Sequence, residues 1–319
     1  MMELSDVLSY TLVHATIRSS TPIVLATIAA VISKQANVIN MGIEGIMLFG
    51  AYTGYVVGYF TRSWMLGLLS SVLLGTLLGM LVGAAHLRFK AHILVVGFAV
   101  NMLALGLTRF MLQQAFHVSG ALVLPDPVSL PTLRIPALEG SPVLSSLFSG
   151  YCFLEPLAIV LVLATWFVLY KTSAGLHLRS VGLNEPSAIT AGIDIGRTKF
   201  AAITLSGLFA GLAGAYLSMG YSTMFVENMT NGRGFMALAA MNFGGGNPIL
   251  AMGGGLIFGF MDSVASRLQS FGFPSQFVLM LPYLTTVLVL TIAMVSARRK
   301  EKNMVLKQYR DGRKSVQGA

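Results

Sequence analysis

The sequence predicts an all-α protein embedded in a membrane, and three features of its composition indicate this fold class. Apolar residues make up 55% of the 319 residues, charged residues only 10%, and the mean hydropathy is +0.75. Soluble domains carry about 25% charged residues, so this chain has too few charges to cover a surface that faces water. Because Cys152 is the one cysteine, a fold held by disulfide bonds is excluded.

Five long apolar stretches precede the centre of the chain, and each is long enough to cross a bilayer. A transmembrane helix needs about 20 apolar residues at 1.5 Å each. The stretches cover residues 11–33, 41–61, 64–85, 93–113 and 152–170. Between the last two, segment 114–151 contains five of the eleven prolines. We therefore expect this segment to be an ordered loop that does not span the membrane.

The charges of the loops orient the chain. Segments 86–90 and 171–199 are basic, and the positive-inside rule places both in the cytoplasm. In segment 114–151, Arg134 is offset by Asp126 and Glu139, which indicates an extracellular loop. Five crossings then place the N-terminus outside the cell.

The tail, residues 298–319, contains eight of the 21 lysines and arginines. A basic tail is sometimes a nucleic-acid-binding segment. In a membrane protein it is more typical of retention in the cytoplasm. We therefore expect a transmembrane domain over residues 1–297, followed by a basic cytoplasmic tail and no nucleic-acid partner.

The second half of the chain needs an even number of crossings between the cytoplasmic loop and the cytoplasmic tail. The evident stretches are 199–219, 248–268 and 276–297, so the fourth crossing must come from 232–246, which is short and broken by glycines. Such segments typically line a cavity, where protein or water satisfies their free backbone groups. The prediction is nine crossings, with the N-terminus outside and the C-terminus inside.

Small residues recur along two of the predicted spans. Gly75, Gly79 and Gly83 are four residues apart, as are Gly207 and Gly211. This spacing places the glycines on one face of each helix and lets helix backbones approach closely in lipid. We therefore expect a tightly packed helical bundle.

The loop 171–199 has the signals of a short helix. Asn184 is a good N-cap, Pro186 is tolerated in a first turn, and Gly192 is a good stop. The enclosed helix, from Glu185 to Ala191, has about two turns. Because so short a helix is marginal alone in water, we expect it to dock on another element.

Polar residues within the apolar stretches are candidates for a solute pathway. Glu44 is the sole charge between Asn37 and Thr61, and a carboxylate at the centre of a span costs about 2.5–3.5 kcal/mol. It lines a pathway, or stabilises the N-terminus of a helix that begins after Asn40, or does both. Asn101 and Asn242 either bind a polar solute or hydrogen-bond between helices. Asn40, Glu44, Asn101 and Asn242 are the pathway candidates.

Three motifs resemble those of a known family. Residues 182–193 resemble the cytoplasmic signature of permease subunits in ATP-binding-cassette importers of the ribose, branched-chain amino acid and nucleoside group, although Leu183 and Ser187 depart from the signature and Glu185 and Pro186 are exchanged. Residues 40–51 are similar to the family's Asn-x-Gly-x-Glu-Gly-x-Met-Leu-x-Gly-Ala run, closest to the nucleoside and purine branch. Residues 232–235, Gly-Arg-Gly-Phe, also fit.

The resemblance implies that the short cytoplasmic helix sits in a groove on an ATPase and couples nucleotide-driven closure to the membrane spans. The implied coupling residues are Gly182, Asn184, Glu185, Ala188, Ala191 and Gly192. The chain has no Gly-x4-Gly-Lys-Ser/Thr phosphate loop. We therefore expect this chain to bind no cofactor, while a separate ATPase subunit binds ATP and magnesium.

The resemblance also implies further partners. These are a second permease subunit that is a different chain and a periplasmic or lipoprotein solute-binding protein, received at loops 114–151 and 220–231. The expected location is the inner membrane of a bacterium.

The resulting hypothesis is a permease subunit that imports a small polar solute, a purine nucleoside, by alternating access. A simple sugar such as ribose is the alternative solute, and an ion-coupled secondary transporter is a rival class. The five histidines have no metal-ligand spacing, and no nucleophile has a matched base. We therefore predict no metal site and no catalytic site, which disfavours an intramembrane enzyme.

Overall fold

The computed structural model describes residues 10–133 and 150–270, with four isolated positions beyond them. This part of the chain is mainly α-helical, as predicted. Its helices are α2 (Tyr10–Gln35), α3 (Ile43–Thr61), α4 (Trp64–Leu87), α5 (Ile93–Phe116), α7 (Leu154–Lys171), α8 (Ser173–Leu183), α9 (Glu185–Thr190), α10 (Ile195–Ala215), α11 (Arg233–Phe243) and α12 (Pro248–Ser270). A π-helix, η2 (Tyr216–Tyr221), continues α10.

Two small antiparallel strand pairs lie at one end of the bundle. Strand β1 (Ala121–Leu122) pairs with β4 (Phe225–Val226), and β2 (Thr132–Leu133) pairs with β3 (Tyr151–Cys152). They tie the described parts of the predicted loop 114–151 to the segment after η2 and to the start of α7.

The predicted spans coincide with helices. The five stretches of the first half match α2, α3, α4, α5 and α7, and those of the second half match α10 with η2, and α12. Among the described residues, six helices are long and apolar enough to cross a membrane: α2, α4, α5, α7, α10 with η2, and α12. The predicted span 276–297 and the tail 298–319 lie outside the described residues, so nine crossings and the orientation stay predictions.

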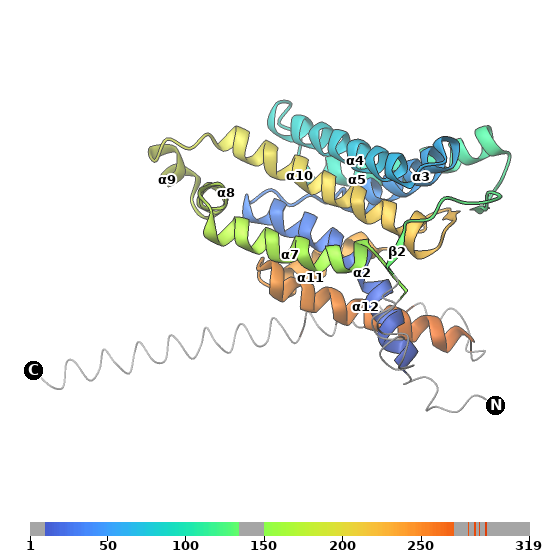
Figure 1. Ribbon diagram of the computed structural model, residues 1–319. Helices are drawn as coiled ribbons and strands as arrows, with labels where there is room; N and C mark the ends of the chain where they lie inside the picture. Colours follow the sequence, from blue (N-terminus) through green and yellow to red (C-terminus); the bar gives the residue numbers. More distant parts are fainter. Residues whose placement is uncertain are drawn as a thin grey trace, which may run out of the picture.

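The helices run between two ends of the bundle, which Figure 1 shows at left and right. At the end that carries α8 and α9, Nε2 of Gln35 donates to the carbonyl of Gly246 (2.7 Å). At the opposite end, which carries the strands, Nη2 of Arg18 donates to the carbonyl of Tyr221 (2.9 Å). We call these the α8–α9 end and the strand end.

The predicted glycine-broken span is helical over only part of its length. Helix α11 has 11 residues, about 16 Å at 1.5 Å per residue, or half of a bilayer's hydrocarbon. The rest of the passage is segment 222–232, which consists of β4 and turns, because Tyr221 lies at the strand end and Gly246 at the α8–α9 end. Helix α11 alone is therefore too short to cross, and the crossing by residues 232–246 stays a prediction.

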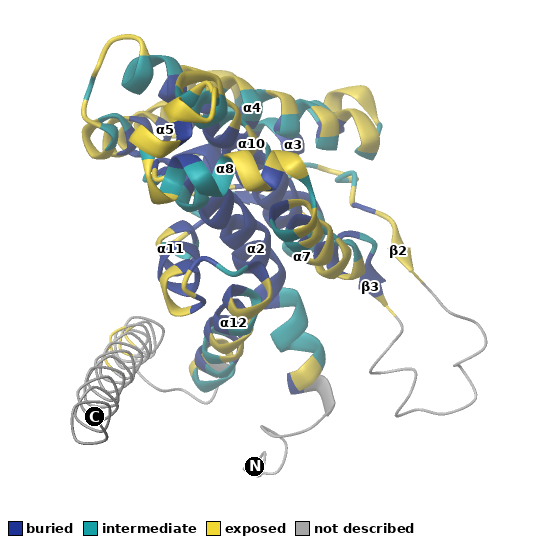
Figure 2. Cartoon of the chain, turned by 90° about the vertical axis from the view of Figure 1, so that its left-hand side faces the viewer, coloured by how far each residue is buried: buried dark blue, intermediate teal, exposed yellow. Residues whose placement is uncertain are grey.

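Burial separates an inner from an outer group of helices. The most apolar windows of α2 and α10 with η2 are 78% and 67% buried, whereas those of α4, α5 and α7 are 28–33% buried. Figure 2 shows the dark, buried helices in the centre and exposed faces on α4, α5 and α7. The exposed faces carry large apolar side chains, which suits contact with lipid or another membrane subunit.

The glycine rows allow the close helix packing that was predicted, and the helices that they bring together are α4 and α10. A Cβ atom added at Gly79 would lie 2.8 Å from the carbonyl oxygen of Ile203 and 3.1 Å from Cα of Gly207. One added at Gly211 would lie 3.1 Å from Cα of Gly75. Because these neighbours are backbone atoms, they cannot move aside, so the two helix backbones approach this closely only where side chains are absent.

We expect Gly207→Leu to destabilise the bundle. A Cβ there would lie 2.8 Å from Cα of Gly79, and overpacking of this kind costs about 1–3 kcal/mol or more. Gly106→Leu on α5 is the control, because no described atom lies within 4 Å of a Cβ at Gly106. Thermal unfolding of both variants in detergent, followed by size-exclusion chromatography, measures the difference. Equal midpoints for the two variants would contradict the packing described here.

Candidate functional site

The chain turns sharply between α2 and α3, and Asn40 stabilises this turn. The Asn40 side chain is completely buried. Its Oδ1 accepts from the backbone N–H of Gly42 (2.9 Å), and its Nδ2 donates to Oγ of Ser206 on α10 (3.1 Å). Asn40 thus links the start of α3 to the middle of α10.

Asn101 on α5 hydrogen-bonds to the same turn. Its Oδ1 accepts from the backbone N–H of Gly45 (2.8 Å), and its Nδ2 donates to the carbonyl of Met41 (3.0 Å). A Cβ at Gly45 would lie 2.7 Å from Cα of Asn101, so only glycine permits this approach. Of the two roles predicted for Asn101, interhelical hydrogen bonding is the one that these contacts form.

Glu44 joins two helix N-termini inside the bundle. It lies in the first turn of α3, and its carboxylate accepts from the backbone N–H groups of Gly232 (2.7 Å) and Gly234 (2.6 Å) at the start of α11. The first N–H groups of a helix have no partner within the helix, and the helix dipole favours negative charge there. The predicted helix-stabilising role is therefore present, and it serves α11 as well as α3.

Arg233, next to this junction, connects α11 to α12 and η2. Its Nη2 donates to Oδ2 of Asp262 (2.8 Å), and its Nη1 donates to the carbonyl of Met229 (3.0 Å). The guanidinium carbon lies 5.7 Å from the centre of the Tyr221 ring, within the range of a cation–π contact. A charge within the bundle is stable when paired in this way.

A second buried ionic cluster, which the sequence did not reveal, lies at the strand end. The hydroxyl of Tyr216 donates to Oε1 of Glu155 (2.6 Å), and Nε of Arg18 lies 3.9 Å from the same oxygen. The Arg18 guanidinium also lies over the Tyr221 ring, at 5.6 Å from its centre. The cluster joins α2, α7 and η2, and Tyr221 lies between its arginine and Arg233.

A cavity of about 330 Å³ opens beside Glu44. It lies between the first turn of α3, the middle of α5 and the segment that leads into α11, and its size is within the range of small-molecule sites. Its walls are Glu44, Gly45, Leu48, Phe98, Asn101, Met102, Leu105, Asn228, Thr230, Asn231, Gly232 and Phe235. The cavity combines amide, hydroxyl and carboxylate groups with two aromatic rings, as a site for a polar aromatic solute requires.

The structure brings only two of the four pathway candidates to this cavity, Glu44 and Asn101. Asn40 is used in the turn described above. Asn242 is exposed near the α8–α9 end, where its Oδ1 accepts from Nζ of Lys34 (3.0 Å). Sequence reasoning missed Phe98 and Thr230, which no local pattern singles out. The Gly-Arg-Gly-Phe motif could have pointed to Phe235.

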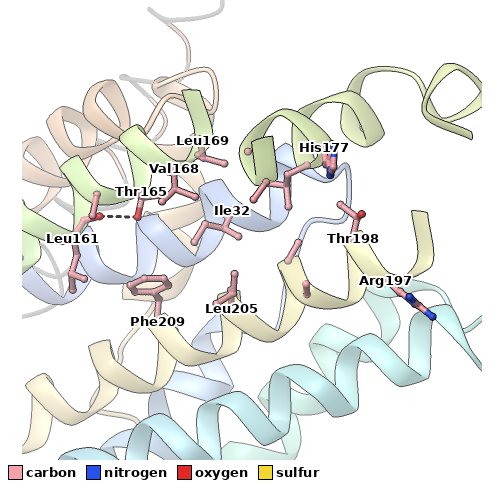
Figure 3. A pocket seen from close by; sticks show the side chains of 16 residues that line it. Ile32, Leu161, Thr165, Val168, Leu169, His177, Arg197, Thr198, Leu205 and Phe209 are labelled. Carbon is pink, nitrogen blue, oxygen red and sulfur yellow. Dashed lines mark hydrogen bonds between the residues drawn. The ribbon is translucent and has the colours of Figure 1, made fainter. Parts of the chain in front are cut away.

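A larger cavity, of about 500 Å³, lies between α7, α8 and α10. Figure 3 shows that mainly apolar side chains line it, with His177, Arg197 and Thr198 at one side. The Thr165 hydroxyl donates to the carbonyl of Leu161 (2.7 Å), the dashed line in Figure 3. The rest of the cavity wall has few groups that could hydrogen-bond to a polar solute, so this cavity is a poor solute site.

The short helix predicted in loop 171–199 is α9, and its ends form as predicted. Oδ1 of Asn184 accepts from the backbone N–H of Ser187 (3.2 Å), and Pro186 lies in the first turn. Gly192 has a φ of +77°, the left-handed conformation that ends helices. Helix α8, which precedes α9, was not predicted; its Gly182 packs against the backbone of Gln35.

Helix α9 docks on its own chain through one face. Ala188 is only 1% exposed, and Nζ of Lys199 on α10 donates to Oε1 of Glu185 (2.6 Å). Among the described residues, the opposite face of α9 is exposed: Ile189 is 62% exposed, and Leu183, the last residue of α8, is 86% exposed. Asn184, Ala191 and Gly192 are exposed as well. The side chain of Ala188, one of the predicted coupling residues, thus contacts the permease itself.

No group of three or more histidine, cysteine, aspartate or glutamate side chains in the described ranges could hold a metal ion.

The chain matches the family model of the branched-chain amino acid transport system permease component over residues 12–290, and it belongs to that family. It is therefore a transport subunit embedded in the cytoplasmic membrane. It is 36% identical over 302 residues to the guanosine ABC transporter permease protein NupQ of Bacillus subtilis, an alignment that covers 91% of this chain and 93% of that protein.

Two further relatives are similar over most of their length. The nucleoside ABC transporter permease protein NupC of Lactococcus lactis is 35% identical, with 86% of this chain and 89% of that protein covered. The putative glucose ABC transporter permease protein TsgC13 of Haloferax volcanii is 30% identical, with 93% and 97% covered. No solved structure matches the chain.

We expect Glu44→Ala to destabilise the permease by about 1–3 kcal/mol, because it leaves the N–H groups of Gly232 and Gly234 without their acceptor. Asp194→Asn is the matched control: it also removes a carboxylate from a helix start, but asparagine is as good a cap and the lost ion pair with Arg197 is exposed. Thermal unfolding of both proteins in detergent compares them. A Glu44→Ala midpoint as high as that of Asp194→Asn would refute the junction.

Proposed function

We propose that this chain is a permease subunit of a bacterial ATP-binding-cassette importer that moves a purine nucleoside into the cytoplasm by alternating access. The observation that carries the proposal is the similarity, over about nine-tenths of the chain, to a guanosine permease and a nucleoside permease. The cavity beside Glu44 supports it, since amide groups and aromatic rings suit a nucleoside.

The basic residues support the predicted orientation in the inner membrane. The α8–α9 end carries Lys34, Arg88, Lys90, Lys171, Arg179, Arg197 and Lys199, whereas the strand end carries Arg18, Arg62, Arg109 and Arg267. By the positive-inside rule, the α8–α9 end faces the cytoplasm. The N-terminus then lies outside, and the strand end receives the solute-binding protein, which is periplasmic or a lipoprotein.

Helix α9 is the proposed contact with the ATPase subunit, which binds ATP and magnesium. Its outward face exposes Ile189, and Leu183 at the end of α8 is exposed beside it. Exposed apolar residues at the surface of a cytoplasmic loop are typical of a protein interface. A second permease subunit, a different chain, completes the membrane part of the importer.

A series of contacts leads from α9 to the cavity. Glu185 on α9 pairs with Lys199 on α10, and α10 contacts Asn40 through Ser206. Asn40 shapes the start of α3, whose Glu44 holds the start of α11. Movement of α9 by the ATPase would reach the cavity through these rigid elements, and this is the proposed route of alternating access.

We expect Ile189→Glu to weaken binding of the ATPase subunit, because it puts a charge in an apolar contact. Val123→Glu is the matched control, since Val123 is also an exposed apolar residue but lies at the strand end. Co-purification of the ATPase with the tagged permease measures binding, and membrane insertion is checked for both variants. Full ATPase recovery with Ile189→Glu would remove α9 from the coupling role.

Uptake of labelled guanosine by cells with the complete transporter tests the solute. We expect unlabelled guanosine to compete strongly, while ribose, glucose and leucine compete at least tenfold less. The similarity to a putative glucose permease makes a simple sugar the second candidate, and stronger competition by glucose or ribose would favour it. Family membership disfavours the ion-coupled transporter; uptake that survives loss of the ATPase and collapses with an uncoupler would restore it.

A further inference from the structure

We propose that the cavity beside Glu44 is a nucleoside-binding subsite in the membrane, in which the base stacks on Phe98 and Phe235 and the sugar hydroxyls bond to Thr230 and Glu44. This inference rests on the proposed function and adds the residues that recognise the solute. The subsite would bind the solute transiently within the permease, and it is distinct from any site on a solute-binding protein.

Two aromatic rings form one wall of the cavity. Phe98 on α5 and Phe235 on α11 lie with their ring centres 6.3 Å apart and their planes 28° apart. Both side chains stay accessible, at 49% and 40% exposed. Every nucleobase has a π-face, and stacking of a base on an aromatic side chain contributes about 1–3 kcal/mol. An accessible ring pair beside polar groups is therefore suited to a base.

The polar residues Thr230 and Glu44 line the same cavity. Thr230 lines the cavity and is completely buried, and its hydroxyl has no hydrogen-bond partner within the described ranges. A buried hydroxyl without a partner costs free energy, which a solute hydroxyl or amide would offset. The Glu44 carboxylate accepts two backbone bonds and has capacity for about four. It can therefore also accept from a sugar hydroxyl.

Exposed polar side chains at the level of the middle of α5 indicate that the cavity opens to water or to a partner subunit. Asn228 and Asn231 are exposed and share the cavity with Asn101 and Leu105, which lie in the middle of α5. The backbone around both asparagines is irregular. Irregular backbone at membrane depth occurs where protein covers it or where it lines an aqueous space, and is not found against lipid. A polar solute can reach the cavity from such a space.

Uptake kinetics of the complete transporter in proteoliposomes test the subsite, with tritiated guanosine and cytidine as probes. Phe98→Leu and Phe235→Leu remove a ring and keep apolar volume, so we expect the KM for guanosine to rise about tenfold. The preference for guanosine over cytidine should fall, because the larger purine loses more stacking. Phe98→Tyr and Phe235→Tyr keep the ring and should restore the wild-type KM.

Thr230→Val provides an independent variant, because it removes the hydroxyl and preserves the shape. We expect it to insert normally and to raise the KM for guanosine severalfold. Phe110→Leu is the control for the ring variants: Phe110 is exposed on α5 but does not line the cavity. Its KM should equal that of the wild type.

The outcomes separate the subsite from the proposed function. If the wild type takes up guanosine and the Phe98, Phe235 and Thr230 variants behave like Phe110→Leu, the subsite is wrong and the function stands. If the wild type takes up no nucleoside, both are wrong. If a leucine variant fails to insert, Thr230→Val decides, and an unchanged KM overturns the subsite.

Discussion

The carboxylate of Glu44, held between the starts of α3 and α11, is the interaction on which the centre of this permease depends. Two non-helical segments, 36–42 and 222–232, precede α3 and α11, and the second contains β4. Both helices therefore begin inside the bundle. Each start presents unpaired N–H groups and the positive end of a dipole. Asn40 and Asn101 accept from the N–H groups at the start of α3, and the Glu44 carboxylate accepts from those of α11, which explains why the bundle tolerates a charge so far from its ends.

The junction at Glu44 also requires the backbones of α3, α5 and α11 to approach closely, and glycines allow this. A Cβ at Gly45 would meet α5, one at Gly97 would lie 2.7 Å from Cβ of Met41, and one at Gly234 would lie 2.7 Å from Oε2 of Glu44. Gly45, Gly50 and Gly234, which lie in the two motifs 40–51 and 232–235, are therefore required by packing. Close backbone approach at glycines also joins α4 to α10.

Local signals in the sequence predicted the elements, and tertiary contacts determined the site. Apolar length located seven helices of the described chain, six of which are long and apolar enough to cross a membrane. Asn184 with Gly192 located α9, because both signals are local. No local signal in the sequence marks segment 222–232 as part of the passage before α11. No local signal shows either that α9 buries Ala188 against the rest of the chain. Phe98 and Thr230 look like ordinary residues of a span and a loop; only the meeting of α5 with α11 places them in one cavity.

Alternating access requires a structural element that can adopt two arrangements. Under the proposed function, the junction of α3 and α11 at Glu44 would be such an element. The hydrogen bonds of Glu44 cross between α3 and α11, so a relative shift of these helices must break or replace them. A solute hydroxyl bound to the same carboxylate would favour whichever arrangement leaves acceptor capacity, and a ligand shifts an equilibrium only through such differential contacts. Glu44 would thus respond both to the solute in the cavity and to α10, which reaches it from α9 through Asn40.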